Sequence, residues 1–347
     1  MMDNIIRNKL LAFAMLLATA CFVNVAKASE KVVVNDLVYE VSLETNTAKV
    51  SAAESAEFRA GVEVVEIASE VEYLGVEYPV TTIGEGMFWN FKNLKRIIFP
   101  PSIQEIEPST FIGCPLLEDI QLPYGLNMIP SFSFTGLNSV ITFPETVSRI
   151  GGYSCIKLAH TPEYDFRNAV SIGSRSFVSC PITELHFSDG IEIGSEAFHS
   201  CNELRVIELP EDFRIYDNGA FQGCGALEKV VVQSMIPRKL INSETGDEID
   251  GLVVDTEIGA DCALYVPKGS AEAYRNSESW SNFKKIVETD FTGIENTETD
   301  YEGVYEIWNI SGRCVYVGVS EKEALTVIAP GIYIIRHNGK VEKKVVL

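Results

Sequence analysis

The sequence contains few of the residues and motifs on which most enzymes depend. Its four histidines are His160, His186, His199 and His337, and none belongs to a His-Glu-x-x-His motif. A Gly-x-Ser-x-Gly nucleophile turn, a phosphate-binding loop and a Cys-x-x-Cys pair are also missing. These absences argue against zinc proteases, serine hydrolases, nucleotide hydrolases and thioredoxin-type enzymes. We therefore expect no enzymatic activity and no cofactor.

A Cys-His nucleophile pair could be assembled only from Cys201 and His199. Cys201, however, stands at a recurring position of the repeat described below, and His199 directly follows the recurring Phe198. The repeat accounts for both residues, so we predict no catalytic site.

Basic residues are also scarce. The 28 Lys and Arg are outnumbered by 49 Asp and Glu, which gives a formal net charge of −21. A surface of this sign repels nucleic acids and anionic membranes. The acidic residues are scattered, and no Asp-x-Asp-x-Asp-Gly loop brings oxygen ligands together for calcium. We expect a solvated acidic surface, with no metal site and no nucleic-acid partner.

Only one stretch of the chain is a long apolar run, and it covers residues 10–23. Arg7 and Lys9 precede it, and the small residues around Lys27 offer a cleavage site. These features predict a secretory signal peptide over residues 1–28 and a secreted protein. Alternatively, Cys21 could be the lipid-bearing N-terminus of a lipoprotein, although the required Leu lies one position too early.

The sequence is rich, by contrast, in a repeat of 21 to 23 residues between Thr82 and about Val232. One unit reads Ile-x-x-x-x-Phe-x-x-Cys-x-x-Leu-x-x-Ile-x-Leu-Pro, and its fullest copies cover residues 106–123 and 193–210. The units open at Ile83, Ile106, Ile129, Ile150, Ile172, Ile193 and Tyr216. The unit at Ile150 is weaker, with Cys155 in place of Phe. A period in the twenties indicates a solenoid, in which each coil buries its apolar side against its neighbours.

Each unit predicts its own local structure. The Ile-x-Leu pair sends alternate side chains to one side and predicts a short strand, which the following proline ends. The Phe-x-x-Cys-x-x-Leu segment has the spacing of a helical or 3₁₀ turn and is expected to form an outer wall. The repeat places a cysteine three residues after Phe in Cys114, Cys180, Cys201 and Cys224. We interpret these cysteines as small buried apolar residues without disulfides.

The segments on either side of the repeats predict caps for the ends of the solenoid. Residues 29–80 alternate between apolar and polar and predict a β-rich N-terminal cap. After an acidic loop at 242–261, a last strand near Tyr265 is followed by a helix starting near Ser270, an N-cap residue. Tyr274 and Trp280 are expected to cover the final coil.

The C-terminal part predicts a separate small domain. A polar acidic linker occupies residues 289–300. Residues 301–347 contain apolar segments separated by turn pairs such as Asn338-Gly339, which predicts strands near 305–308, 314–317, 325–327, 332–335 and 340–347.

The repeats resemble the BspA-like leucine-rich repeats of surface proteins from Bacteroidetes and some other microbes. The resemblance covers roughly Thr82 to Val287, although this chain lacks the Asn ladder of more familiar leucine-rich repeats. It implies an α/β leucine-rich-repeat solenoid over residues 81–288 with a small all-β C-terminal sandwich. It also implies a cell-surface adhesion or protein-interaction role. The partner would be a protein or other macromolecule: host matrix, a host receptor or other bacteria.

The C-terminal motifs resemble a second family. Ile310-Ser311-Gly312-Arg313, Pro330-Gly331-Ile332-Tyr333 and Lys343-Lys344-Val345-Val346-Leu347 look like those of the type A sorting domain of the type IX secretion system. This implies interaction with secretion machinery and display at the outer-membrane surface or outside the cell. The alternative is a retained β-sandwich without a sorting role, in an envelope scaffold protein that is periplasmic or lipid-anchored and has no host ligand.

The candidate binding surface follows from the predicted strands. On each strand the residue between the two buried positions should face outward, which selects Gln121, Thr142, Asp165, His186, Glu208 and Val231, with Ile98 at the start. Stacked coils would turn this column into a continuous curved sheet surface of the kind that solenoids use for partners.

Overall fold

The computed structural model describes residues 30–118, 120–162 and 164–290 and four strands near the C-terminus, 305–309, 314–318, 331–337 and 340–346. The chain divides into two compact units, residues 1–289 and residues 290–347. The predicted signal peptide with Cys21, and most of the predicted linker 289–300, lie outside the described residues.

The first unit begins with a β-rich end. Its strands are β1 (Glu30–Val34), β2 (Leu37–Ser42), β3 (Thr47–Ala53), β5 (Glu70–Tyr73) and β6 (Val76–Ile83). They form a sheet in the order β1-β2-β3-β6-β5, in which side chains of β2 alternate between buried and half-buried. A six-residue helix, α2 (Ala56–Gly61), starts where the Ser55 side chain accepts the N–H of Phe58. Because β6 also pairs with β8 (Glu105–Ile106), this sheet continues directly into the solenoid.

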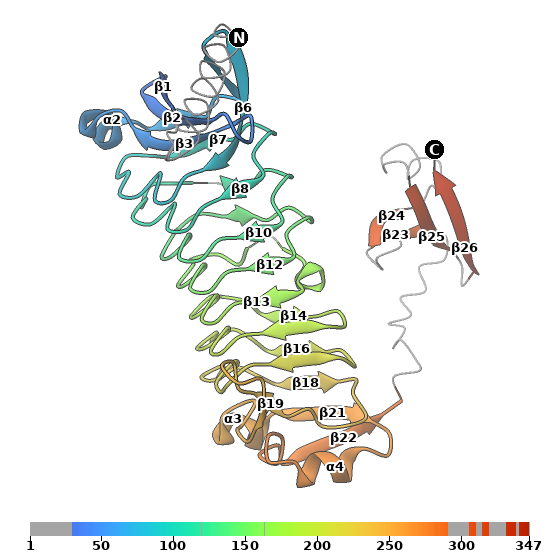
Figure 1. Cartoon of the computed structure of the whole chain (residues 1–347). Helices are drawn as coiled ribbons and strands as arrows, with labels where there is room; N and C mark the ends of the chain where they lie inside the picture. Colours follow the sequence, from blue (N-terminus) through green and yellow to red (C-terminus); the bar gives the residue numbers. More distant parts are fainter. Residues whose placement is uncertain are drawn as a thin grey trace, which may run out of the picture. The chain divides into compact units, whose positions relative to one another are not determined.

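The coils that follow stack one above another (Figure 1), and their parallel strands form two rows. The first row holds the Ile-x-Leu strands: β4 (Val64–Glu66), β7 (Arg96–Ile98), β9 (Ile120–Gln121), β11 (Ile141–Thr142), β14 (Glu184–His186), β16 (Val206–Leu209), β18 (Lys229–Val232), β21 (Ala263–Pro267) and β22 (Lys285–Thr289). The second row comprises β8, β10 (Met128–Ile129), β12 (Arg149–Ile150), β13 (Ser171–Ile172), β15 (Ile191–Ile193) and β17 (Phe213–Ile215). The predicted solenoid is confirmed. The second row was not predicted, because strands of two or three residues are too short to show alternation.

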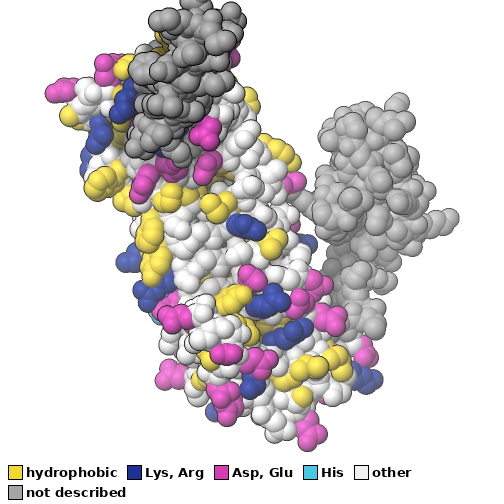
Figure 2. Space-filling view, viewed as in Figure 1, with side chains coloured by type: hydrophobic (Ala, Val, Ile, Leu, Met, Phe, Trp, Pro, Cys, Tyr) yellow, Lys and Arg dark blue, Asp and Glu magenta, His cyan; other side chains and the backbone are white. Residues whose placement is uncertain are grey.

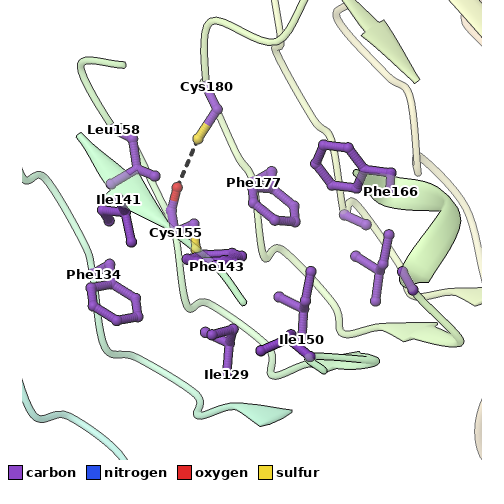
Figure 3. Close-up of a cluster of buried hydrophobic side chains, with 14 of the residues drawn as sticks. Ile129, Phe134, Ile141, Phe143, Ile150, Cys155, Leu158, Phe166, Phe177 and Cys180 are labelled. Carbon is purple, nitrogen blue, oxygen red and sulfur yellow. Dashed lines mark hydrogen bonds between the residues drawn. The ribbon is translucent and has the colours of Figure 1, made fainter. Parts of the chain in front are cut away.

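The core lies between these rows and is built from stacked aromatic rings. Phe111 and Phe134 stack with centroids 4.9 Å apart, and Phe177 and Phe198 with centroids 5.4 Å apart. These separations are close to the spacing of neighbouring strands, so each coil adds one ring to the stack. Where Cys155 replaces the ring, Phe143 and Phe166 contribute to the same apolar cluster (Figure 3). Repeated positions therefore form continuous columns.

The predicted outer wall is present as separate turns rather than as a helix. In one coil the N–H of Cys201 donates to Phe198 O and that of Leu204 to Cys201 O, both at 3₁₀ spacing. The residue two positions after Phe has a positive φ in every unit, which interrupts any helix. These residues are Asn90, Gly113, Gly136, Lys157, Ser179, Ser200 and Gly223.

The repeated cysteines are buried, and those of residues 30–290 form no disulfide. The thiols of Cys114, Cys201 and Cys224 each donate to the carbonyl oxygen of the recurring Phe in the preceding coil, at 2.9, 3.0 and 3.2 Å. Cys180 makes the equivalent bond to Cys155 O at 2.7 Å, drawn in Figure 3. Each cysteine thus fills space and also links two coils.

The C-terminal end of the first unit is covered by two buried aromatic side chains. Tyr274 lies on helix α4 (Ala271–Asn276), and its hydroxyl donates to Ser234 O at 2.8 Å. Trp280 Nε1 donates to Arg238 O at 2.8 Å, and neither side chain is exposed. Ser270 precedes the helix as predicted, but its hydroxyl donates to Pro267 O instead of capping an N–H.

The segment expected to be an acidic loop at 242–261 is more ordered than predicted. Strands β19 (Leu240–Ile241) and β20 (Glu248–Ile249) form a hairpin, and helix α3 (Thr256–Asp261) follows Asp255. No helix in the described parts of the chain is long and apolar enough to cross a membrane.

The second unit contains four described strands. These are β23 (Tyr305–Asn309), β24 (Cys314–Gly318), β25 (Gly331–His337) and β26 (Lys340–Val346). They pair antiparallel in the order β24-β23-β25-β26, and Ile307 and Ile335 are buried. The strand expected at 325–327 lies outside the described residues, as do the motifs at 310–313 and the residue Leu347.

Candidate binding surface

The predicted column of outward-facing residues forms in two separate stretches of the first row. Gln121 and Thr142 are direct partners on β9 and β11. Farther along, Glu208 lies between His186 and Val231 as the partner of both. The structure therefore brings together five of the six predicted residues in two groups.

Asp165 does not belong to this column. It stands before a short 3₁₀ helix, Phe166–Asn168, where its side chain accepts the N–H of Arg167 at 3.0 Å and the Nε–H of Arg167 at 3.2 Å. This coil has no Ile-x-Leu pair, and aspartate favours the position that starts a helix. The row is consequently interrupted between β11 and β14.

Val231 lies on the strand but is covered. Only 6% of it is exposed, although it is not part of the apolar core that contains Val230 and Val232. Its column partners are Glu208 on one side and Tyr265 on the other. Neighbouring side chains on the outer surface thus enclose a small residue, and the expectation that Val231 is available to a partner is wrong.

A charged network occupies the second stretch. His186 Nδ1 lies 2.7 Å from Glu208 Oε2, and its Nε2 lies 3.3 Å from Glu184 Oε2. The hydrogen bond with Glu208 raises the pKa of His186, and the same bond lowers the pKa of Glu208. Beyond it, the Lys229 ammonium lies 5.1 Å from the ring centroid of Tyr265. This stretch is therefore polar, with its charges largely satisfied.

The first stretch is different because it adjoins a groove of about 590 Å³. Residues of β7, β9 and the segments on either side of these strands line it, among them Lys95, Arg96, Ile98, Gln121, Pro123 and Tyr124. Ile98 is 39% exposed and Tyr124 is 68% exposed. β7 and β9 belong to different sheets, so the first row is interrupted between these two strands, as it is between β11 and β14.

Sequence reasoning found Ile98 and Gln121 but missed Tyr124. The signal was available, because Pro123-Tyr124-Gly125 places a large aromatic residue in a turn, where it has little to pack against. Of the two basic residues, Lys95 is paired with Glu63 at 2.8 Å, whereas Arg96 has no ion-pair partner in the described part of the chain. The groove therefore offers an aliphatic side chain, an aromatic ring and a guanidinium group together.

The structure does not assemble a reactive Cys-His pair. Cys201 is completely buried, and its thiol pKa is raised by burial. His199 Nδ1 is instead 2.9 Å from Ser200 Oγ. Among the described residues, no three His, Cys, Asp or Glu side chains are placed to hold a metal ion.

Comparison with protein families finds a BspA type leucine rich repeat region in six copies, over residues 68–161 and 139–242. Together these ranges cover half of the chain. No curated protein matches it.

Several solved structures are similar to the chain. A leucine-rich repeat protein from Bacteroides ovatus has 20% identity and a TM-score of 0.35, covering 70% of this chain and 80% of its own. The leucine rich repeat protein of T. pallidum has 16% identity and a TM-score of 0.36. The match covers 57% of this chain and 91% of the T. pallidum chain. A leucine rich cell surface protein from Faecalibacterium prausnitzii has 16% identity and a TM-score of 0.23. The match covers 73% of this chain and 98% of the F. prausnitzii chain.

Proposed function

This chain belongs to the BspA-type leucine-rich repeat family, and on that basis we propose that it is a secreted surface protein that binds another protein through the groove beside Ile98 and Tyr124. Leucine-rich repeats are generally protein-interaction modules, and solenoids present extended surfaces for partners. The partner classes that fit an adhesion role are host matrix proteins, host receptors and surface proteins of other bacteria.

One observation favours the groove over the other parts of the first row as the binding site. Two large apolar side chains, Ile98 and Tyr124, remain exposed next to Arg96, which has no ion-pair partner among the described residues. Aromatic and arginine side chains carry much of the binding energy at protein interfaces when they become buried. Burying a side chain of this size removes apolar area worth about 1.5–3 kcal/mol. The groove therefore suits a partner with an apolar protrusion beside a carboxylate.

Secretion and display are part of the same proposal. They are supported by the apolar run and cleavage site in residues 1–28 and by the motifs of residues 301–347. Under this proposal the C-terminal domain engages the secretion machinery. The competing function is an envelope scaffold with no host ligand, in which the same domain is retained as a structural element.

The binding proposal is tested by measuring saturable binding of the full chain to immobilised matrix proteins and to host cells. Tyr124→Asp and Ile98→Asp should each weaken binding at least tenfold, because a carboxylate resists burial in the interface. Leu74→Asp is the matched control, since Leu74 is 84% exposed in a turn and does not line the groove. Equal binding by all three variants would rule out the groove.

Location is tested by terminal-peptide mass spectrometry on the native protein, together with protease shaving of intact cells. Surface display predicts an N-terminus at Ser29, loss of the chain after about Asp290, and repeats that are sensitive to shaving. An intact Leu347 on a periplasmic protein that co-purifies with envelope proteins, without host binding, would favour the scaffold function.

A further inference from the structure

A column of outward side chains runs along the turns that follow the second-row strands, separate from the groove. In each unit the residue two positions before Phe has a positive φ. These residues are Gly86, Ser109, Phe132, Tyr153, Arg175, Glu196 and Gly219, with Cys155 counted as Phe in its unit. We call them the turn column.

The backbones of successive coils lie very close together beside this column. A Cβ atom built on Gly173 would lie 2.5 Å from Gly152 N, and one on Gly194 would lie 2.5 Å from Ser174 N. The N–H of each column residue from Gly86 to Arg175 donates to a carbonyl of the next coil, as Phe132 does to Gly152 O at 3.2 Å. At these glycines there is no room for a side chain between neighbouring coils. The side chains of the turn column therefore project from an edge where the backbones are tightly packed.

Four neighbouring side chains of the turn column contact one another in series. The rings of Phe132 and Tyr153 stack at 4.9 Å with their planes 12° apart. The guanidinium of Arg175 lies 5.8 Å from the Tyr153 centroid, and its Nη2 lies 2.7 Å from Glu196 Oε1. Figure 2 shows hydrophobic, acidic and basic side chains interspersed over the described part of the surface that faces the viewer.

The two aromatic residues occupy strained backbone positions. Phe132 has φ +59° and Tyr153 has φ +58°, a region that bulky side chains rarely adopt and that costs about 1–3 kcal/mol per residue. Other coils have glycine, serine, arginine or glutamate at this position, so the fold itself does not require a ring. The turn has a positive φ in every unit, and only these two coils place an aromatic ring on it.

The stack ends at Phe132, whose side chain is 46% exposed. The next two positions of the turn column, Ser109 and Gly86, have little or no side chain. They leave a shelf two coils deep, about 10 Å at the spacing of neighbouring strands. The Ser109 hydroxyl makes no hydrogen bond within the described structure. At the far end of the shelf, the Cβ of Trp89 lies 3.8 Å from where a Cβ on Gly86 would be, and Trp89 is 56% exposed.

We propose that this shelf binds a neutral saccharide, with the C–H face of a sugar ring packed on Phe132 and a ring hydroxyl bonded to Ser109. Arg175 is paired with Glu196 and Lys49 with Glu107, whereas the exposed Glu85 beside Gly86 has no ion pair within the described residues. An unpaired carboxylate disfavours an anionic ligand, so a neutral ligand with an apolar face and a polar edge fits best. A basic peptide is less suitable because Arg175 already lies at the other end of the ring stack.

The test measures binding of the full chain to an array of neutral gluco-, galacto- and manno-oligosaccharides, followed by calorimetry on any that bind. Phe132→Asn should reduce affinity at least tenfold and Phe132→Trp should retain it. Asparagine tolerates a positive φ, so Phe132→Asn should not lower the melting temperature. Leu74→Asn is the matched control, because Leu74 is also an exposed apolar residue with a positive φ, +52°.

Three results would overturn the proposal. The first is no binding to any oligosaccharide. The second is unchanged binding by Phe132→Asn. The third is binding of an arginine-rich peptide, in place of saccharides, that Phe132→Asn abolishes. Tyr124→Asp should leave saccharide binding unchanged, which separates this site from the proposed protein-binding groove.

Discussion

His186 Nδ1 lies 2.7 Å from Glu208 Oε2, across neighbouring first-row strands of the solenoid. Both side chains remain partly exposed, at 33% and 39%. Their hydrogen bond is the main reason that the pKa of His186 is raised and the pKa of Glu208 is lowered. The carboxylate of Glu184 adds a weaker contribution to His186 from its other side.

The first prediction concerns pH. A raised His186 pKa contributes stability that is complete below its ordinary value of 6.5 and lost as pH rises through the raised value. A lowered Glu208 pKa contributes stability that is complete above its ordinary value of 4.5 and lost as pH falls through the lowered value. The pair should therefore stabilise the fold most between those two values. In an NMR titration, Glu208→Gln should lower the pKa of His186.

The control for that titration is Glu228→Gln, which removes a carboxylate that pairs with Arg205 rather than with His186. It should leave the His186 titration almost unchanged. If Glu208→Gln and Glu228→Gln gave the same His186 pKa as the unsubstituted protein, the hydrogen bond would not control it.

The second prediction concerns the ring stack. Phe198 is fully buried and its ring lies near those of Phe177 and Phe221, with centroids 5.4 and 5.7 Å away. Phe198→Ala should lower the free energy of unfolding by about 3–5 kcal/mol, because it leaves a cavity in the column. Tyr124→Ala, at an exposed site, should change it by no more than about 0.5 kcal/mol. Urea unfolding followed by circular dichroism measures both, and equal effects would contradict the stack's role.

The third prediction concerns the close approach of coils. Gly173→Ala should destabilise the solenoid, because its Cβ would lie 2.5 Å from Gly152 N and backbone atoms cannot give way easily. Gly225→Ala is the matched control, since nothing lies within 4 Å of a Cβ there and its φ is not positive. Thermal unfolding should show a lower midpoint for Gly173→Ala only. A similar midpoint for both variants would mean that the coils separate readily at Gly173.

The fourth prediction concerns the thiols. Burial raises the pKa of Cys114 to about 11 and that of Cys180 to about 12, so almost no thiolate is present at neutral pH. The cysteines of residues 30–290 should resist iodoacetamide in the folded protein and react in urea, as measured by peptide mass spectrometry. Rapid labelling of Cys114 or Cys180 without urea would show that the solenoid opens locally.

The sequence predicted the solenoid and its core because those features repeat. An Ile-x-Leu pair or a Phe-x-x-Cys-x-x-Leu turn is a local pattern, and its recurrence at the same interval identifies which residues stack. The Phe and Cys columns follow from that interval alone. Gln121, Thr142, His186 and Glu208 could be placed on one surface for the same reason, since alternate residues of a strand share a side.

The tertiary structure decided what happens where neighbouring coils differ. Val231 is enclosed by side chains from the coils on either side, and Asp165 starts a short helix where its coil lacks the strand motif. The groove beside Tyr124 depends on the break between β7 and β9, and the shelf at Phe132 depends on Ser109 and Gly86 in the two coils before it. Exposure is a property of contacts between residues some 20 positions apart, so a repeat pattern determines the framework while the packing of unlike coils determines which surface a ligand can reach.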